Sequence, residues 1–454
     1  MSLLVKDRKF YKTFFSMTGV IAMQNLITFA VNLADNIMIG GYSQTALSGV
    51  AIVNQIQFLL QMLMLGTGSA IGVLSAQYWG KKDLEPIRKA TSVGVFLGVA
   101  ISAVMMLLVF FFPTQAMGLL TNEQAVIQEG SKYLVIICFS YVLFAISNNL
   151  LSALRSVETV KIGFVVNLIA LVVNIVLNYG LIYGRLGLPE MGVQGAAIAT
   201  LTARVVEFVV VLLYVLLWDK KICWRLNHLL HIDKVMFRDF IRVGMPLILA
   251  NGIWGVAMSV QTAILGRLGE DTIAANSIAT TIFQVVSVVT YAGTTSSSVI
   301  IGKTVGQGDI PRVKAYTKSM QVMFVIIGIV TGLVLYSCTD LIIGLYDVTP
   351  VAAELARQFI LVLSFTVVGT SYQCACLTGI VTGGGDTKFV LINDLIHQWL
   401  IVIPAAFLSA FVFHGPMWVT FACLKADQVL KCFVAIVKVN RYRWIRVLTR
   451  ENKE

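Results

Sequence analysis

Twelve long apolar stretches divide this chain, and they restrict its possible folds more than any other feature of the sequence. Each approaches the ~20 residues that an α-helix needs to cross the hydrocarbon core of a bilayer. They cover residues 14–40, 51–77, 91–113, 133–154, 162–184, 193–217, 244–266, 272–300, 319–339, 358–380, 389–413 and 417–439. With 57% hydrophobic and 13% charged residues, the chain cannot form a soluble surface over its length. The stretches therefore predict an all-α integral membrane protein with twelve transmembrane helices.

The two halves of the sequence are copies of one another. A shift of 226 residues aligns the pairs Gly40 and Gly266, Gly80 and Gly306, and Asp83 and Asp309. Duplicated apolar chains are typical of two-lobed transporters whose substrate path lies between the repeats. We expect two pseudo-symmetric six-helix lobes at 1–218 and 244–454, joined by a polar cytoplasmic linker at 219–243 that contains an interfacial helix.

Lysine and arginine residues predict the orientation, because they are retained on the cytoplasmic side of short loops. With the N-terminus inside, 27 of the 34 basic residues fall in cytoplasmic segments. Both termini are therefore expected in the cytoplasm, and the protein is expected to be a multi-pass protein of the cell membrane. The basic residues are spread over many helix ends rather than gathered on one domain, which argues against nucleic-acid binding despite a net charge of +11.

The sequence contains no pattern typical of an enzyme or of a cofactor site. The seven cysteines form no CxxC pair and have no histidine at metal-ligand spacing, so disulfides and a bound transition metal are not expected. A Walker A sequence is also absent. Transport energy would then come from a gradient of protons or sodium ions, with no cofactor.

Asp35 is the strongest candidate among the few ionisable groups inside predicted helices. An acid there costs several kcal/mol in a bilayer and is a functional candidate by default. It lies about 9 Å below the outer end of its helix at a 1.5 Å rise per residue. Asn174, Asn178 and Thr200 fall at similar depths, and Asn54, Gln55 and Gln57 come close.

These carboxylate, amide and hydroxyl oxygens would form a hard site that suits a proton or Na⁺. The alternative is that the amides and hydroxyls only join helices through hydrogen bonds. Applying the repeat offset places Asp35 on Gln261, so only the N-terminal lobe carries this acid.

Three other sets of intramembrane charges have structural alternatives. Arg204 and Glu207 are three residues apart on one helical face and are expected to form a structural ion pair. Asp394 and His397 have the same spacing; they would relay protons or make polar contacts between helices. Lys425 and Asp427 are interpreted as part of a partly hydrated helix surface.

Several segments together resemble the multidrug and toxic compound extrusion (MATE) family of antiporters. They are ADNIMIGGYSQTALSGVAI from residue 34, NIVLNYGLIYG from 174, GVQGAAIAT from 192, LSALRSVET from 151 and LTGIVTGGGDT from 377. The resemblance covers essentially the whole chain. It implies a twelve-helix, two-lobed transporter that exchanges organic cations or other amphipathic drugs for inward-moving protons or sodium ions.

The resemblance also implies a cation-coupling site made of Asp35, Asn174, Asn178 and Thr200. Asn178 is an aspartate in some relatives, so this site has one negative charge fewer. Carboxylates that several relatives carry in the C-terminal lobe are missing around Trp254 and Ser371, so a second cation site of that kind is not expected.

We expect a monomer that binds small amphipathic or cationic molecules within the lipid bilayer. Adaptable apolar side chains would line the substrate path, among them Met38, Met62, Met64, Phe58, Phe283 and Trp254. Two other functions compete with drug efflux. A flippase for lipid-linked saccharides would need a strongly cationic cavity, whereas Arg204 is the only arginine inside a predicted helix; a channel would not need a repeat with one asymmetric acid.

Overall fold

The computed structural model describes residues 4–230, 232–344, 346 and 348–450. Within this part of the chain, all regular structure is helical. The chain divides into two compact units. The N-terminal unit comprises Met23–Ser75 and Asp83–Ile248, and the C-terminal unit comprises Met1–Ala22, Ala76–Lys82 and Leu249–Glu454. The lobe boundaries expected from the sequence remain predictions, and their outermost residues, 1–3 and 451–454, lie outside the described residues.

Three long helices change unit partway along their length. They are α1 (Arg8–Tyr42), α2 (Gln44–Lys81) and α10 (Lys234–Gly266). The predicted linker 219–243 leads into the last of these helices. It contains the short helix α9 (Asn227–Leu230) and the first turns of α10.

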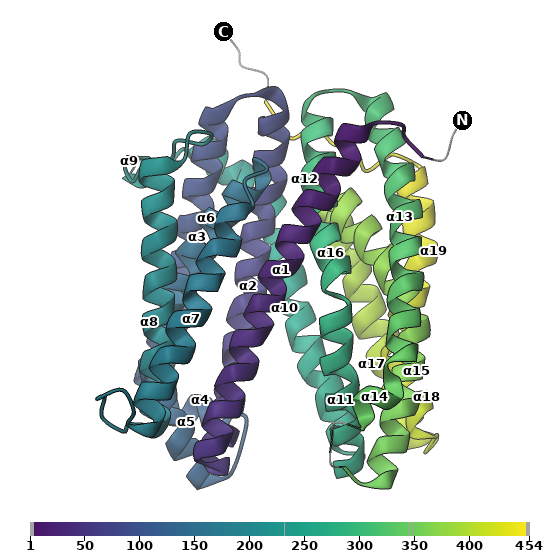
Figure 1. Cartoon of the computed structure of the whole chain (residues 1–454). Helices are drawn as coiled ribbons and strands as arrows, with labels where there is room; N and C mark the ends of the chain where they lie inside the picture. Colours follow the sequence, from purple (N-terminus) through teal and green to yellow (C-terminus); the bar gives the residue numbers. More distant parts are fainter. Residues whose placement is uncertain (1–3, 231, 345, 347, 451–454) are drawn as a thin grey trace. The chain divides into compact units, whose positions relative to one another are not determined.

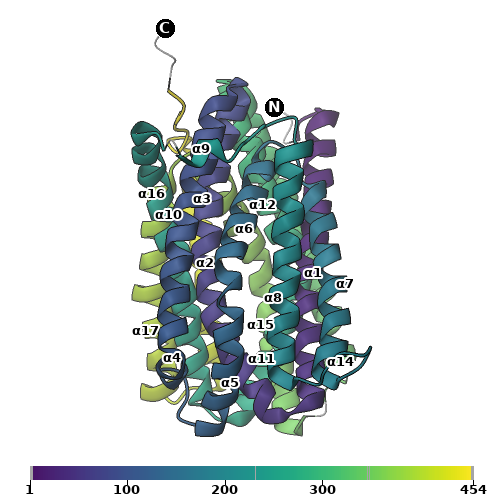
Figure 2. The same cartoon turned by 90° about the vertical axis from the view of Figure 1, so that its left-hand side faces the viewer.

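The N-terminal unit is built around two pairs of packed helices. α7 packs along α8, and α3 packs along α6 (Figure 2). Besides its parts of α1, α2 and α10 and the short α9, this unit contains α3 (Leu84–Phe111), α4 (Pro113–Gly118), α5 (Gln124–Ile137), α6 (Ser140–Ser156), α7 (Lys161–Tyr183), α8 (Gly192–Leu213) and the π-helical η1 (Tyr214–Trp218).

The C-terminal unit is centred on α15, which packs against α11, α13 and α19 (Figure 1). The Phe359 and Phe421 rings stack in its core with centroids 4.1 Å apart. Its further elements are α11 (Glu270–Val286), α12 (Val288–Gly306), α13 (Ile310–Ser337), α14 (Thr339–Ile343), α15 (Pro350–Gln373), η2 (Cys374–Val381), α16 (Thr387–Leu395), η3 (Ile396–Val402), α17 (Ile403–Phe407), η4 (Leu408–Val412), α18 (Met417–Leu424) and α19 (Ala426–Asn440).

Nine of the described helices are long and apolar enough to cross a membrane. Two more spans result if each bent pair counts as one, namely α5 with α6 at 52° and α11 with α12 at 46°. The last predicted segment, 417–439, is helical but breaks at Lys425 between α18 and α19. Its lysines and Asp427 lower its hydropathy below that of the other spans.

Local signals in the sequence explain several helix boundaries. The Asp309 side chain accepts a hydrogen bond from the Arg312 backbone N–H at 3.0 Å and caps α13. Gly184 ends α7 in the left-handed conformation, with φ +64°. Gly195 lets α8 approach α7 closely, because a Cβ at this position would lie 2.5 Å from the Leu181 carbonyl oxygen. This close approach packs α8 against α7, the two helices that carry Asn174, Asn178 and Thr200.

Candidate functional site

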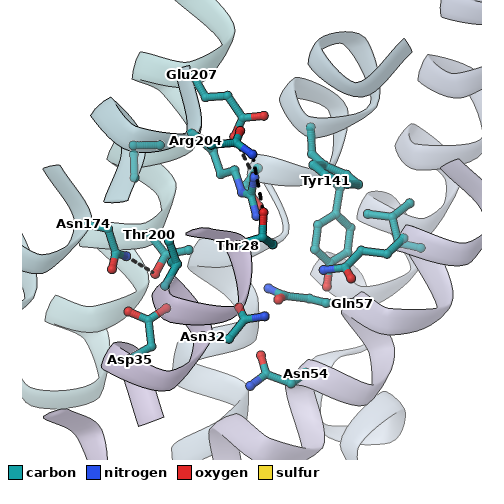
Figure 3. A pocket seen from close by; sticks show the side chains of 18 of the residues that line it. Thr28, Asn32, Asp35, Asn54, Gln57, Tyr141, Asn174, Thr200, Arg204 and Glu207 are labelled. Carbon is teal, nitrogen blue, oxygen red and sulfur yellow. Dashed lines mark hydrogen bonds and ion pairs between the residues drawn. The ribbon is translucent and has the colours of Figure 1, made fainter. Parts of the chain in front are cut away.

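The four residues predicted to couple a cation lie together in the N-terminal unit. Asp35 comes from α1, Asn174 and Asn178 from successive turns of α7, and Thr200 from α8. Figure 3 labels Asp35, Asn174 and Thr200. Asn178 Nδ2 donates hydrogen bonds to the Asp35 carboxylate and, at 3.2 Å, to Asn174 Oδ1. Asn174 Nδ2 in turn donates to Thr200 Oγ1 at 3.2 Å. These contacts form one continuous polar cluster across three helices.

The cluster is buried but leaves one oxygen without a hydrogen-bond partner. Asp35 is 9% exposed, and both asparagines are completely buried. Asn178 Oδ1 has no hydrogen-bond partner within the described part of the chain. A buried acceptor without a donor is costly unless a cation or water satisfies it. Together with the Asp35 carboxylate it supplies the oxygen ligands that a small hard cation prefers.

Asp35 faces a cavity in the N-terminal unit, which we call the N-terminal cavity. Counting its open mouth, it contains about 930 Å³ of empty space. Fourteen of its 21 lining residues are polar, in a chain whose residues are mostly hydrophobic. The polar ones are Thr28, Asn32, Asp35, Asn54, Gln57, Gln61, Tyr133, Ser140, Tyr141, Asn167, Asn174, Thr200, Arg204 and Glu207.

Arg204 and Glu207 lie in the wall of this cavity as an ion pair. Arg204 Nη1 is 2.6 Å from Glu207 Oε2, and Glu207 is 4% exposed. The guanidinium also lies 5.0 Å from the Phe144 ring centroid, a cation–π distance. Since the two charges cancel, the fixed charge of the cavity comes from Asp35, which takes part in no ion pair among the described residues.

Four of the methionine and aromatic side chains expected to line the substrate path are absent from the described lining of this cavity, and their place in a substrate path stays a prediction. Met38, Met62, Met64 and Phe58 are absent from its lining. Met64 is fully buried in the core of the N-terminal unit instead. In the C-terminal unit, Phe283 packs against the core and Trp254 lines a separate small pocket.

Sequence reasoning identified only part of the polar wall. Asn54 and Gln57 were expected near Asp35 and do line the cavity, whereas Gln55 points elsewhere and is exposed. Asn32 and Gln61 were not singled out. The signal that identifies the α2 residues is their spacing, because 54, 57 and 61 recur on one helical face.

In the C-terminal unit, Asp394 and His397 do not contact each other through a hydrogen bond. Asp394 Oδ1 lies 2.9 Å from Lys431 Nζ, and His397 Nδ1 lies 2.8 Å from the Asn393 carbonyl oxygen. A proton relay between Asp394 and His397 stays a prediction.

The interpretation of Asp427 as part of a hydrated helix surface is wrong. Asp427 is 1% exposed and lies 3.2 Å from Lys431 Nζ. It also accepts a hydrogen bond from Gln398 Nε2 at 2.8 Å, and Gln261, the repeat counterpart of Asp35, donates to Gln398 at 3.0 Å. The two units therefore differ at this position. In the N-terminal unit Asp35 faces a cavity, whereas in the C-terminal unit its counterpart Gln261 joins a network that contains the Asp427–Lys431 ion pair.

No group of three histidine, cysteine, aspartate or glutamate side chains able to hold a metal occurs in the part of the chain that the structure describes. All seven cysteines are free thiols.

An all-α chain of long apolar helices around a polar cavity with one unpaired acid defines a membrane transporter rather than an enzyme. The family model described as MatE matches residues 21–180 and 246–408. The chain belongs to this family, so the resemblance seen in the sequence is confirmed.

Curated relatives and a solved structure agree with this assignment. A probable multidrug resistance protein NorM of Photorhabdus laumondii is 28% identical over 397 residues, covering 87% of this chain and 86% of the relative. A protein of the same description from Listeria monocytogenes is 24% identical over 437 residues, covering 95% and 94%. A mutant of the Vibrio cholerae MATE transporter VcmN has a similar fold, with a TM-score of 0.87 at 16% identity over 97% of this chain and 99% of that one. The predicted fold class is thereby confirmed.

Proposed function

We propose that this protein is a multidrug efflux antiporter that exchanges an organic cation for an inward-moving proton or sodium ion at Asp35. The names of the curated relatives support multidrug export. The observation that carries the coupling proposal is the position of Asp35, a buried carboxylate that faces the N-terminal cavity and has no ion-pair partner among the residues that the structure describes.

The charges of the cavity supply a physical basis for exchange. With Asp35 ionised and the Arg204–Glu207 pair neutral, the cavity has a net charge of −1, which favours an organic cation. A proton or Na⁺ at Asp35 cancels that charge and lowers the affinity for the organic cation. The two cations therefore compete, and their different affinities for the outward-open and inward-open states shift the transport equilibrium.

The oxygens around Asp35 fit either coupling ion. Asn178 Oδ1 would ligate Na⁺ together with the carboxylate, while Asn174 and Thr200 lie close enough to interact with Asp35. Alternatively, the same Asn178 oxygen would accept a hydrogen bond from a protonated carboxyl group.

A flippase for lipid-linked saccharides is the second candidate, and the cavity disfavours it. Binding a diphosphate requires several unpaired cations. Among the described residues that line the N-terminal cavity, Arg204 is the only lysine or arginine, and Glu207 neutralises it at 2.6 Å.

We also propose that the protein is a monomer of the cell membrane with both termini in the cytoplasm. The distribution of lysine and arginine over the loops supports this orientation.

The experiment is efflux of a fluorescent organic cation from proteoliposomes under an imposed proton or sodium gradient. Wild type is compared with Asp35→Asn and with Asp340→Asn, a matched control whose side chain is 81% exposed. We expect gradient-driven efflux in wild type and in the control, and its loss in Asp35→Asn. Gradient-driven efflux by Asp35→Asn would refute coupling through this residue.

A further inference from the structure

Five amide side chains of the described residues line the N-terminal cavity in addition to the Asp35 cluster, and four of them come from α1 and α2. We call Asn32 of α1 and Asn54, Gln57 and Gln61 of α2 the cavity amides (Figure 3 labels the first three). On α2 they follow one another at intervals of three and four residues, which places them on one helical face.

The cavity amides have unused hydrogen-bonding capacity. None of them makes a hydrogen bond to another residue in the described ranges, although each carries two N–H donors and a carbonyl acceptor. Tyr141 adds a second observation, since it is 1% exposed, lines the cavity, and its hydroxyl has no partner among the described residues. Polar groups in a membrane protein cost free energy unless water or a ligand satisfies them.

The fold does not require amides at these positions. The repeat offset of 226 pairs the four cavity amides with residues of the second half that include no amide. Those counterparts are Met258, Thr280, Phe283 and Ser287, for Asn32, Asn54, Gln57 and Gln61 respectively. Helices form over the corresponding part of the C-terminal half without these amides, although the counterpart of α2 is bent by 46° between α11 and α12, at Ser287. Helix formation therefore does not explain the cavity amides, which are available to a molecule that enters the cavity.

We propose that the N-terminal cavity selects hydrophilic organic cations that carry several hydroxyl or amide groups, in preference to lipophilic cations without hydrogen-bond donors. Asp35 supplies the charge complement, and the cavity amides with Tyr141 supply the hydrogen bonds. A lipophilic cation would leave these groups desolvated and unpaired. This cost discriminates between the two kinds of cation more strongly than the hydrogen bonds gained by a hydrophilic one. This inference rests on the proposed export function and specifies its substrate class.

The test compares two monovalent cations in proteoliposomes that contain the full chain. N-methylglucamine carries five hydroxyl groups, whereas tetraphenylphosphonium has no hydrogen-bond donor. The variants are Gln57→Leu in the cavity and Gln55→Leu, a matched control two residues away on α2 that is exposed and outside the lining. We expect Gln57→Leu to raise the KM for N-methylglucamine by roughly five- to tenfold, the loss of one or two hydrogen bonds.

The KM for tetraphenylphosphonium should stay constant or fall in Gln57→Leu, and Gln55→Leu should change neither value. An equal effect on both probes, repeated in Gln61→Leu, would overturn the inference. So would a wild-type protein that transports tetraphenylphosphonium but not N-methylglucamine, and the proposed efflux function would survive that result. If neither probe moves under either gradient, the proposed function itself fails.

Discussion

At the scale of single residues, the charge of Glu207 decides what the N-terminal cavity attracts. Its carboxylate neutralises Arg204 at 2.6 Å, so Asp35 remains the uncompensated charge. In the proposed function the pair does more than join two turns of α8, because Glu207 would keep the guanidinium from repelling the proposed cationic substrate.

We therefore predict that Glu207→Gln weakens transport of organic cations by about tenfold. A unit charge several ångströms away contributes on the order of 1–2 kcal/mol at the effective dielectric constant of a partly buried site. The double variant Arg204→Gln/Glu207→Gln restores the charge balance and should recover most of the affinity. The KM for one organic cation, measured in both variants, tests this prediction. A double variant whose KM is as high as that of Glu207→Gln alone would contradict it.

At the scale of helices, the repeat explains a pair of glycines in the C-terminal unit. Gly80 is the second-last residue of α2 and Gly306 the last residue of α12, and the two are counterparts at an offset of 226. A Cβ at Gly80 would lie 2.1 Å from the Lys303 carbonyl oxygen, and one at Gly306 would lie 1.9 Å from that of Gln77. Gln77 and Lys303 are counterparts at the same offset. The glycine of each helix therefore lies against the same backbone carbonyl position of the other helix.

Gly80→Ala should consequently destabilise the protein by roughly 1–3 kcal/mol, the usual cost of overpacking against backbone. Gly72→Ala is the matched control on the same helix, because a Cβ there meets nothing within 4 Å. Thermal unfolding in detergent measures both. Equal Tm values for the two variants would show that α2 and α12 do not cross this closely.

The start of α1 is held by Asp7. Tyr316 donates a hydrogen bond to Asp7 Oδ2 at 2.6 Å, and this bond is the main reason that the pKa of the carboxyl is below its usual value of 3.8. A lowered pKa in the folded state stabilises the protein above pH 3.8, and this contribution is lost as the pH falls through the folded-state value.

Asp7→Asn should therefore lower Tm by a few degrees at most at neutral pH, since the side chain is partly exposed. The difference from wild type should shrink as the pH falls below 3.8. Tyr316→Phe is the control and should reproduce the loss. A difference in Tm that stays constant between pH 3 and pH 7 would contradict this role.

The sequence predicted the helices better than it predicted the breaks within them. Apolar runs locate the membrane spans, but α2 continues to Lys81 and α10 starts at Lys234, because a helix keeps its backbone hydrogen bonds after it leaves the apolar region. The break at Lys425 carries no glycine or proline signal in the sequence.

For the site, the sequence predicted the depth of a residue in the membrane better than the direction of its side chain. Asp35, Asn174, Asn178 and Thr200 lie together as their predicted depths indicated. Periodicity does not say which polar face of a helix meets a cavity, and for that reason Asn32, Gln61 and the burial of Asp427 were identified only from the structure.

At the scale of the whole molecule, the proposed orientation places the exposed Cys223 on the cytoplasmic side. A membrane-impermeant maleimide should label Cys223 in inverted vesicles but not in intact cells. Glu190→Cys in a Cys223→Ser background is the control, because the exposed Glu190 lies in the α7–α8 connection on the opposite predicted side. Labelling of Cys223 in intact cells would reverse the orientation.

The most direct test of the central claim is a binding measurement on purified protein. The dissociation constant of one organic cation is determined as pH and Na⁺ concentration vary, for wild type and Asp35→Asn. We predict that protons or Na⁺ weaken binding to wild type competitively, whereas binding to Asp35→Asn is weaker and independent of both. The same competition in Asp35→Asn would place the exchange of cations at another residue and contradict this account.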